Sequence, residues 1–202
     1  MNDKKKKVYD AIFDTVLETN GISSITVGEI AKRAGIGKGS VYMYFTNKEQ
    51  MICEAINYLI EQLTEKLIDY KPDKSKEFKG VLCDFLKNQI SVLGRYSEMF
   101  YSAVSAEFFP MLTPDMRTEM VDVVRELKTK YEQKILGILA VGAKEGVISA
   151  EHTPFDILAV TQMFISMSGH FVQKDVPVIC SDIDEHVAMM YDMTVKMLAG
   201  PV

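Results

Sequence analysis

The chain has 202 residues, of which 48% are hydrophobic and 25% are charged, and this globular composition excludes an intrinsically disordered protein. Such a length fits one large domain or two small ones with a buried core. The formal net charge of −5 shows no overall basicity. Residues 1–50, however, carry eight Lys/Arg against six Asp/Glu, whereas residues 51–202 carry 15 against 22. A mildly basic segment therefore precedes an acidic remainder.

Helical spacing recurs along the chain, so the sequence predicts an all-α fold of about nine helices. The first helix carries an apolar stripe closed by the stop signal Asn20-Gly21; the stripe consists of Val8, Ile12, Phe13, Val16 and Leu17. The second helix begins at a capping box formed by Thr26 and Glu29 and ends at Gly35.

A short third helix is expected over about residues 38–45, and a long fourth helix from Asn47-Lys48-Glu49 to Lys71-Pro72. The fourth helix keeps its apolar residues in one phase: Met51, Ala55, Leu59, Leu63 and Leu67. No low-complexity linker follows it. We therefore expect it to join an N-terminal domain, residues 1–50, to a second helical domain, residues 51–202.

Beyond residue 70 the helices are predicted from their start and stop signals. Two apolar segments, 78–94 and 97–109, are expected to be interrupted by Gly94 and Pro110. Thr113-Pro114-Asp115 starts a long helix that runs to Gly146. Thr153-Pro154 starts the next helix, and Ser181 with the acidic residues after it starts the last one.

Residues 35–45, GIGKGSVYMYF, fit the turn and second helix of a helix-turn-helix motif. Gly35 allows the positive φ of a tight reversal, and Gly37 can cap the following helix. Lys38, Gly39 and Ser40 then fall in the first turn, the part of a recognition helix that enters the major groove. In the same segment Ile36, Val41 and Phe45 supply the apolar contacts, and Tyr42 and Tyr44 offer hydroxyls to flanking phosphates.

The run TVGEIAKRAGIGKGSVYMYFTNKEQM resembles the DNA-binding domain of the tetracycline-repressor (TetR) family, and the likeness covers about residues 5–63. The resemblance implies groove and phosphate contacts on the third helix and a phosphate anchor at the start of the fourth. We accordingly expect DNA contacts from Thr26, Lys38, Gly39, Ser40, Tyr42, Tyr44 and Lys48. It also implies a ligand-binding domain whose last two helices form a dimer interface.

Two glycines depart from the family pattern. Gly28 stands where a better helix former is usual, at a cost of about 1 kcal/mol in local helix stability. Gly37 stands where a serine or threonine cap is common, which is a smaller loss. These departures indicate a loosely held recognition helix that orders fully on DNA.

The second domain is rich in methionine, since ten of the 13 methionines lie between Met99 and Met197. This composition suits an adaptable apolar pocket, although methionine also fills ordinary cores. Our candidate lining residues are Met99, Phe100, Tyr101, Met116, Met120, Met163, Phe164, Met167 and His170. For His170 a hydrogen-bonded interior position is favoured over a ligand contact.

Residues 157–173 contain no Asp, Glu, Lys or Arg and are the membrane-span candidate. Their short length and polar residues favour a helix buried on most sides. Apolar residues on every face, the small residues Ser166, Ser168 and Gly169, and a stripe on the last helix support dimerisation, with a plain helical core as the alternative. That stripe consists of Val187, Met190, Met193 and Met197.

Other chemistry has little support in the sequence. Cys53, Cys83 and Cys180 form no CxxC pair, which suits free thiols and a cytoplasmic protein, and the N-terminus lacks the apolar segment of a signal peptide. His152, His170 and His186 show no metal-binding spacing, and no nucleophile-elbow, phosphate-loop or dinucleotide motif occurs. We expect no enzyme activity, no metal and no cofactor.

The sequence therefore predicts a DNA-binding transcriptional regulator that acts as a homodimer on a palindromic operator. We expect a repressor that a small, largely apolar effector releases from DNA. Two alternatives stay open: a DNA-binding dimer controlled by a partner protein, and a helical enzyme or lipid carrier with no DNA role. The run Lys4–Lys7 is either a solubilising tail or a set of phosphate contacts.

Overall fold

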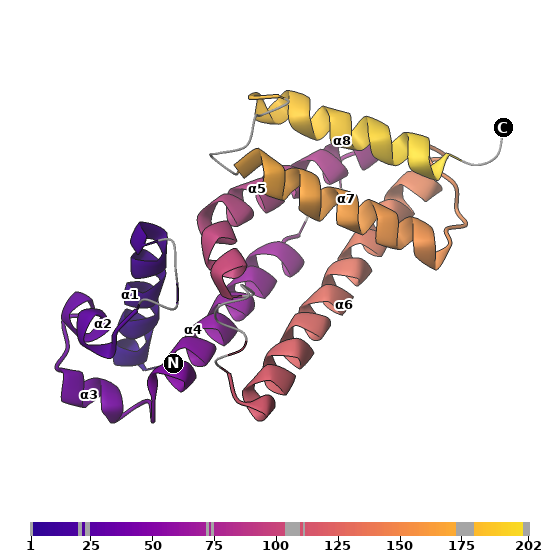
Figure 1. Cartoon of the computed structure of the whole chain (residues 1–202). Coiled ribbons are helices and arrows are strands. Elements are labelled where there is room, and N and C mark those ends of the chain that lie inside the picture. The colour runs from indigo at the N-terminus through magenta and orange to yellow at the C-terminus, as the bar shows by residue number, and fades with distance from the viewer. Residues whose placement is uncertain are drawn as a thin grey trace. The chain divides into compact units, whose positions relative to one another are not determined.

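The computed structural model of the chain is shown in Figure 1. It describes residues 2–19, 22, 25–71, 73, 75–103, 110, 112–172 and 180–199, without the side chains of residues 17, 19 and 95–103. Across these ranges the chain is all-helical and forms no strand, as predicted. Its elements are α1 (Asp3–Thr19), α2 (Val27–Arg33), α3 (Lys38–Tyr42), α4 (Lys48–Leu63), the π-helical turn η1 (Thr64–Ile68), α5 (Phe78–Ala103), α6 (Pro114–Lys144), α7 (Pro154–Val172) and α8 (Ile183–Leu198).

The predicted start signals lie at the helix starts. The Thr153 hydroxyl accepts a hydrogen bond from Asp156 N at 3.2 Å, while the Asp156 carboxylate accepts one from Thr153 N at 2.8 Å. This reciprocal pair is a capping box at the start of α7. At the start of α8, the Asp182 carboxylate accepts from the backbone N–H groups of Asp184 and Glu185. Both caps satisfy backbone donors that a helix end leaves without partners.

Three predicted boundaries are wrong. α3 ends at Tyr42, so Phe45 follows the helix instead of closing it. α4 ends at Leu63 and is followed directly by the π-helical turn η1, so the helical segment ends at Ile68 and does not reach Lys71-Pro72. α5 runs through Gly94 without a break, because one glycine lowers helix stability by only about 1 kcal/mol and tertiary packing overrides it.

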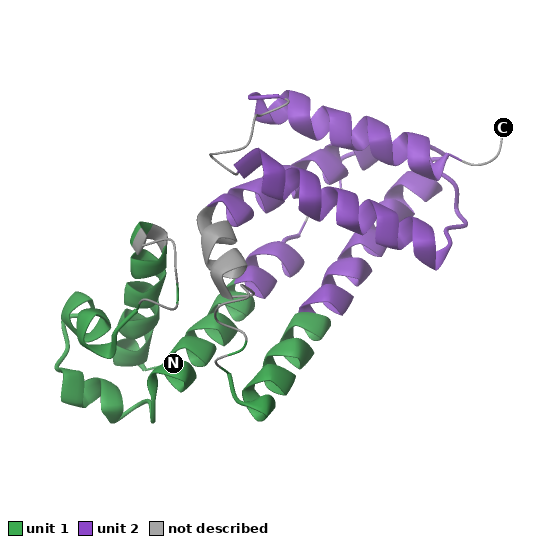
Figure 2. Ribbon diagram, in the orientation of Figure 1, with its two compact units in different colours: residues 1–62, 96–126 green, residues 63–95, 127–202 purple. Residues whose placement is uncertain are grey.

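The chain forms two compact units (Figure 2). Unit 1 comprises Met1–Gln62 and Tyr96–Glu126, and unit 2 comprises Leu63–Arg95 and Leu127–Val202. Helices α1 to α3 therefore belong to unit 1, and α7 and α8 belong to unit 2. These units follow packing in space, and the predicted domain boundary after residue 50 stays a prediction.

In unit 1, the apolar stripes predicted for α1 and α4 supply much of the core. α1 packs against α2, and α2 packs against α3. Buried residues of the two stripes in this unit are Val8, Ile12, Val16, Met51, Ala55 and Leu59. Aromatic rings extend this core, since Tyr58 stacks on Tyr9 with ring centroids 5.3 Å apart and on Phe13 at 6.2 Å.

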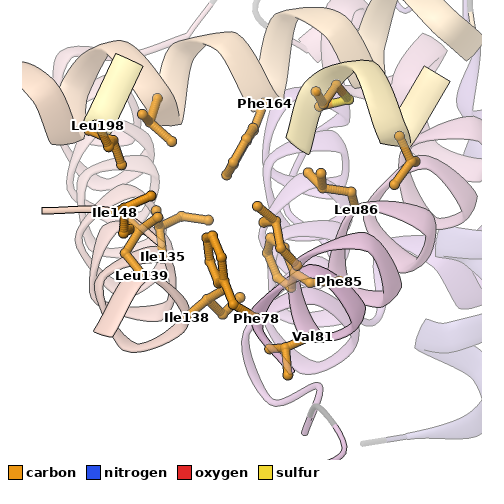
Figure 3. Close-up of a cluster of buried hydrophobic side chains, with 14 of the residues drawn as sticks. Phe78, Val81, Phe85, Leu86, Ile135, Ile138, Leu139, Ile148, Phe164 and Leu198 are labelled. Carbon is orange, nitrogen blue, oxygen red and sulfur yellow. The ribbon is translucent and has the colours of Figure 1, made fainter. Parts of the chain in front are cut away.

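In unit 2, side chains from α5, α6, α7 and α8 form one apolar cluster, in which Phe78, Phe85 and Phe164 are fully buried (Figure 3). The approach of α6 to α5 depends on a glycine. A Cβ added at Gly142 would lie 2.7 Å from Phe78 Cδ1, closer than side chains tolerate. Gly94 has no such role, because its added Cβ would lie 3.4 Å from Val172 Cγ1, an ordinary van der Waals contact.

A polar group, Gln89, lies inside the unit 2 core with 1% of its surface exposed. Its amide nitrogen donates to Phe164 O at 2.9 Å and to Ser168 Oγ at 3.1 Å, and its amide oxygen accepts from the Tyr131 hydroxyl. Burial raises the pKa of the Tyr131 hydroxyl, which therefore stays a donor at neutral pH. Three helices, α5, α6 and α7, are thereby joined by hydrogen bonds through one amide.

Among the described residues α7 alone is long and apolar enough to pass for a membrane span, with a mean hydropathy of 1.2. Only 28% of the apolar stretch of α7 is buried, so the prediction of a helix buried on most sides is wrong for the single chain. Phe155, Leu158 and Ile165 are exposed, whereas Phe164 on the inner face is fully buried. α7 thus presents an apolar outer face as well as an apolar inner face.

Candidate nucleic-acid interface

The turn between α2 and α3 has the geometry that its sequence predicts. Gly35 adopts a φ of 67°, in the left-handed region that favours glycine. Ala34 N donates to Ile30 O at 2.8 Å and Ile36 N donates to Ala31 O at 3.0 Å, so the end of α2 is closed by backbone hydrogen bonds. α2 and α3 are therefore joined by a short, fixed reversal, as in a helix-turn-helix.

α3 is anchored through its apolar side. Val41 and Phe45, exposed by 1% and 2%, pack into unit 1, and Phe45 N donates to Val41 O at 3.0 Å. Gly37 caps the helix in extended backbone conformation without a side-chain hydrogen bond, as predicted. The anchor is thus hydrophobic at the C-terminal end of α3, and the N-terminal end has no side-chain cap.

The opposite side of α3 is open to solvent. Lys38, Gly39, Tyr42 and Met43 are exposed, and we call these four residues the reading face. Ser40 and Tyr44 flank it and are half-buried. A Cβ added at Gly39 would meet no atom within 4 Å, so packing within the chain gives no reason for a glycine there.

Thr26 lies at the N-cap of α2 and is exposed. Its hydroxyl accepts from Glu29 N at 3.3 Å and its backbone N–H donates to Glu29 Oε2 at 3.1 Å, which confirms the predicted capping box. The hydroxyl also donates to Glu29 Oε2 at 2.7 Å. These hydrogen bonds hold the pKa of the Glu29 carboxyl below its usual range. The hydroxyl therefore already has a structural role, and any phosphate contact at Thr26 is shared with that role.

The start of α4 is built from side-chain caps. Gln50 N donates to Asn47 Oδ1 and Thr46 N donates to Gln50 Oε1, both at 2.7 Å. Lys48, the first helical residue, is half-buried, and its charge contributes to lowering the pKa of Glu29. This places a lysine and the positive end of the α4 dipole close to the start of α2.

The lysine run at the N-terminus divides into two groups. Lys5 is half-buried, with its ammonium 2.6 Å from Glu54 Oε2 and 5.1 Å from the centre of the Phe45 ring. The same carboxylate accepts from the Tyr9 hydroxyl at 2.9 Å. Lys5 therefore fixes α1 against α4. The other three lysines, Lys4, Lys6 and Lys7, are exposed.

The described side chains do not test the predicted effector pocket. Those of Met99, Phe100 and Tyr101 lie outside the described residues. Met116 and Met120 belong to unit 1, whereas the other four candidates belong to unit 2: Met163, Phe164, Met167 and His170. In the described part of unit 1 an open hollow runs along α6, but its lining includes Asp115, Glu119, Asp122 and Glu126 and is acidic. The pocket lining therefore stays a prediction.

The histidines also differ from expectation. His170 is half-buried, whereas His186 is 4% exposed. The His186 Nε2 lies 3.2 Å from Met167 O, and its ring is tilted against the Phe171 ring with centroids 4.8 Å apart. The interior histidine of the last two helices is thus His186. Its place is consistent with helical spacing, because Val187 and Met190 on the same helix are buried too.

The sequence reasoning missed two features. Met43 was not among the predicted contacts, although it lies four residues after Gly39 and so shares a helix face with it. Gln89 was also missed, because its partners lie 42 to 79 residues away in the sequence. Helical spacing could have revealed Met43, but no local pattern marks Gln89.

Comparison with known proteins agrees with this geometry. Residues 15–55 match the family model described as bacterial regulatory proteins, tetR family. The chain is 21% identical over 162 residues to the nucleoid occlusion factor SlmA of Vibrio campbellii, covering 73% of this chain and 83% of SlmA. It is 32% identical over 77 residues to the fatty acid metabolism regulator protein of Bacillus subtilis, covering 36% of this chain and 39% of that protein.

A solved structure shares the fold over most of the chain. The transcriptional regulator FadR from Bacillus subtilis, in complex with stearoyl-CoA, has a TM-score of 0.62 and 21% identity, and the match covers 96% of this chain and 98% of FadR. A capped α2, a glycine turn and an exposed α3 are thus found where the family model matches. Residues 15–55 therefore form a segment of the kind found in bacterial regulatory proteins of the tetR family, and the rest of the chain shares the fold of solved members.

Proposed function

We propose that this regulator is a repressor that binds a palindromic operator as a homodimer in the cytoplasm. The observation that carries the proposal is the reading face of α3, which is solvent-exposed while the opposite side of the helix is anchored by Val41 and Phe45. A helix held in this way can enter the major groove without losing any internal contact.

Within this proposal each predicted contact has a defined task. Gly39 lets the backbone of α3 approach a base edge or phosphate, and Lys38 and Ser40 lie in the turn that enters the groove. Tyr42 and Tyr44 offer hydroxyls to flanking phosphates. Thr26 and Lys48 mark the starts of α2 and α4, where helix N-termini favour anions.

Dimerisation is supported by the apolar outer surfaces of the last two helices. Phe155 is 74% exposed on α7, and Met193 and Met197 are each 42% exposed on α8. Burial of such residues against a second copy removes apolar area from water. Of the predicted stripe, Val187 and Met190 are buried within the chain, so the exposed methionines carry the proposed interface.

The proposed effector is a small molecule with a substantial apolar part. The methionine-rich composition supports it, and so does the likeness to FadR, whose structure contains stearoyl-CoA. Release requires that the effector bind more tightly to a conformation that fits the operator poorly. An equal affinity for both conformations would shift nothing.

The DNA-binding proposal is tested with Lys48→Ala. DNA selected from a random library by the full-length protein serves as probe, and affinity is measured over a series of salt concentrations. Because a phosphate contact releases about one counterion, we expect the slope of log affinity against log salt to fall by about one per subunit. Lys128→Ala, which removes an exposed lysine of unit 2, is the matched control and leaves the slope unchanged. An unaltered slope in Lys48→Ala contradicts the phosphate anchor.

A second candidate follows from the likeness to SlmA, a protein named for nucleoid occlusion, which extends over 73% of this chain. In this alternative the chain is a DNA-binding dimer that a partner protein controls. Adding stearoyl-CoA and shorter acyl-CoAs to the protein–DNA complex separates the two candidates. Release of DNA and a raised melting temperature favour the effector, while an unchanged complex favours the partner protein.

A further inference from the structure

Met43 has the highest exposure among the large hydrophobic side chains of the described residues, at 81%. It lies at the C-cap of α3, between Tyr42, which is 51% exposed, and the half-buried Tyr44. Exposing so much apolar surface opposes the hydrophobic effect. On a helix that is otherwise placed to meet DNA, the exposure indicates that the side chain is covered when the DNA is bound.

The space next to Met43 is left open by Gly39. These residues are four positions apart, so they lie on one face of α3, and helical side chains lean toward the N-terminus. Apart from its chain neighbours and the helix backbone, a Cβ added at Gly39 would meet no atom within 4 Å. The exposed Met43 side chain and the open backbone at Gly39 therefore share one face of the helix.

The chemistry of the major groove limits what the Met43 side chain can contact there. Methionine has no hydrogen-bond donor and only a weak acceptor, so it cannot read the polar edges of bases with useful strength. The one apolar feature that a base pair presents in the major groove is the 5-methyl group of thymine. Building on the proposed function, we propose that Met43 contacts the 5-methyl group of a thymine in each half-site, with Gly39 giving the base pair room to approach.

The test removes the methyl group from the DNA instead of altering the fold. Each thymine of the selected duplex is replaced in turn by deoxyuridine, symmetrically in both half-sites, and affinity is measured with the wild-type protein and with Met43→Ala. Because Met43 is mostly exposed, we expect the variant to keep the wild-type melting temperature. A duplex in which 5-methylcytosine replaces cytosine shows whether methyl groups at other positions have an effect.

The expected result is one thymine per half-site whose replacement weakens wild-type binding about fourfold per half-site, as burial of one methyl-sized group gives. In Met43→Ala the same replacement has no effect. The proposal is overturned if no thymine shows methyl dependence, or if the dependence persists in Met43→Ala. A wild-type protein that selects no DNA sequence at all contradicts the proposed function itself, which is a distinguishable failure.

Discussion

Unit 1 and unit 2 are both helical, but different kinds of contact determine them. In unit 1 the geometry of α2 and α3 depends on residues close in sequence, such as the Thr26–Glu29 capping box and the turn at Gly35. In unit 2 it depends on residues far apart, such as Gln89 with Phe164 and Gly142 with Phe78. The turn between α2 and α3 is therefore specified by local sequence, whereas the unit that contains α7 and α8 is specified by contacts in its core.

The largest expected effect follows from cutting the hydrogen bonds inside unit 2. In Gln89→Leu the Tyr131 hydroxyl and the Ser168 hydroxyl lose their buried partner, and each unpaired group costs about 1–3 kcal/mol. We expect a loss of about 2–4 kcal/mol in the free energy of unfolding, measured by urea denaturation. Tyr131→Phe, which removes one of these bonds, loses less. Wild-type stability in Gln89→Leu would show that the amide does not join the three helices.

A somewhat smaller effect is expected at Gly142. In Gly142→Ala the new Cβ meets the buried Phe78 ring at 2.7 Å, and overpacking of this kind costs about 1–3 kcal/mol. The matched control lies on the same helix: a Cβ at Gly137 meets nothing within 4 Å. Gly137→Ala is therefore expected to stabilise the chain by about 0.5–1 kcal/mol through helix propensity alone. Equal melting temperatures for the two variants would rule out the close approach of α6 to Phe78.

The smallest expected loss of stability follows from removing the N-terminal cap of α2 in unit 1. Thr26→Ala removes the N-cap of α2, a change that costs about 1 kcal/mol in typical helices. The effect depends on pH. Since the folded-state pKa of Glu29 is lowered, its contribution is present above its ordinary value of 4.5 and is lost as the pH falls through the folded-state value.

Thermal melts from pH 7 down to pH 3 follow this dependence. The difference between wild type and Thr26→Ala should be largest at pH 7 and should shrink in acid. Glu29→Gln, which cannot ionise, is the control and removes this contribution to the acid sensitivity. A difference that stays constant with pH would mean that the Glu29 carboxylate does not take part in the cap.

The difference between local and long-range contacts also explains which features of the fold could be predicted from the sequence. The capping boxes, the turn at Gly35 and the apolar stripes were predictable because each lies within one or two helical turns. The continuity of α5 through Gly94 was not, since it depends on packing against other helices. The sequence also could not show that Val187 and Met190 are buried within the chain while Met193 and Met197 are exposed. Helical periodicity shows which side of a helix is apolar, but not what that side packs against.

The candidate site divides in the same way. The sequence predicted every residue of the reading face except Met43. The four-residue spacing between Gly39 and Met43 would have placed Met43 on the same face of α3. The proposed effector pocket depends on which helices meet, so composition alone could give its chemical character but not its lining residues. The lysine run shows the limit most clearly, since the ion pair that fixes Lys5 is formed with Glu54, 49 residues away.

The central claim, that the reading face of α3 binds DNA, is tested most directly by two glycine variants. A Cβ at Gly39 and a Cβ at Gly28 each meet no atom within 4 Å, so Gly39→Ala and Gly28→Ala both gain about 0.5–1 kcal/mol of stability. The measurement is the affinity of each variant for the selected operator. We predict that Gly39→Ala binds at least about tenfold more weakly than wild type, a loss of about 1.4 kcal/mol, while Gly28→Ala binds as wild type does. Undiminished binding by Gly39→Ala would contradict the account.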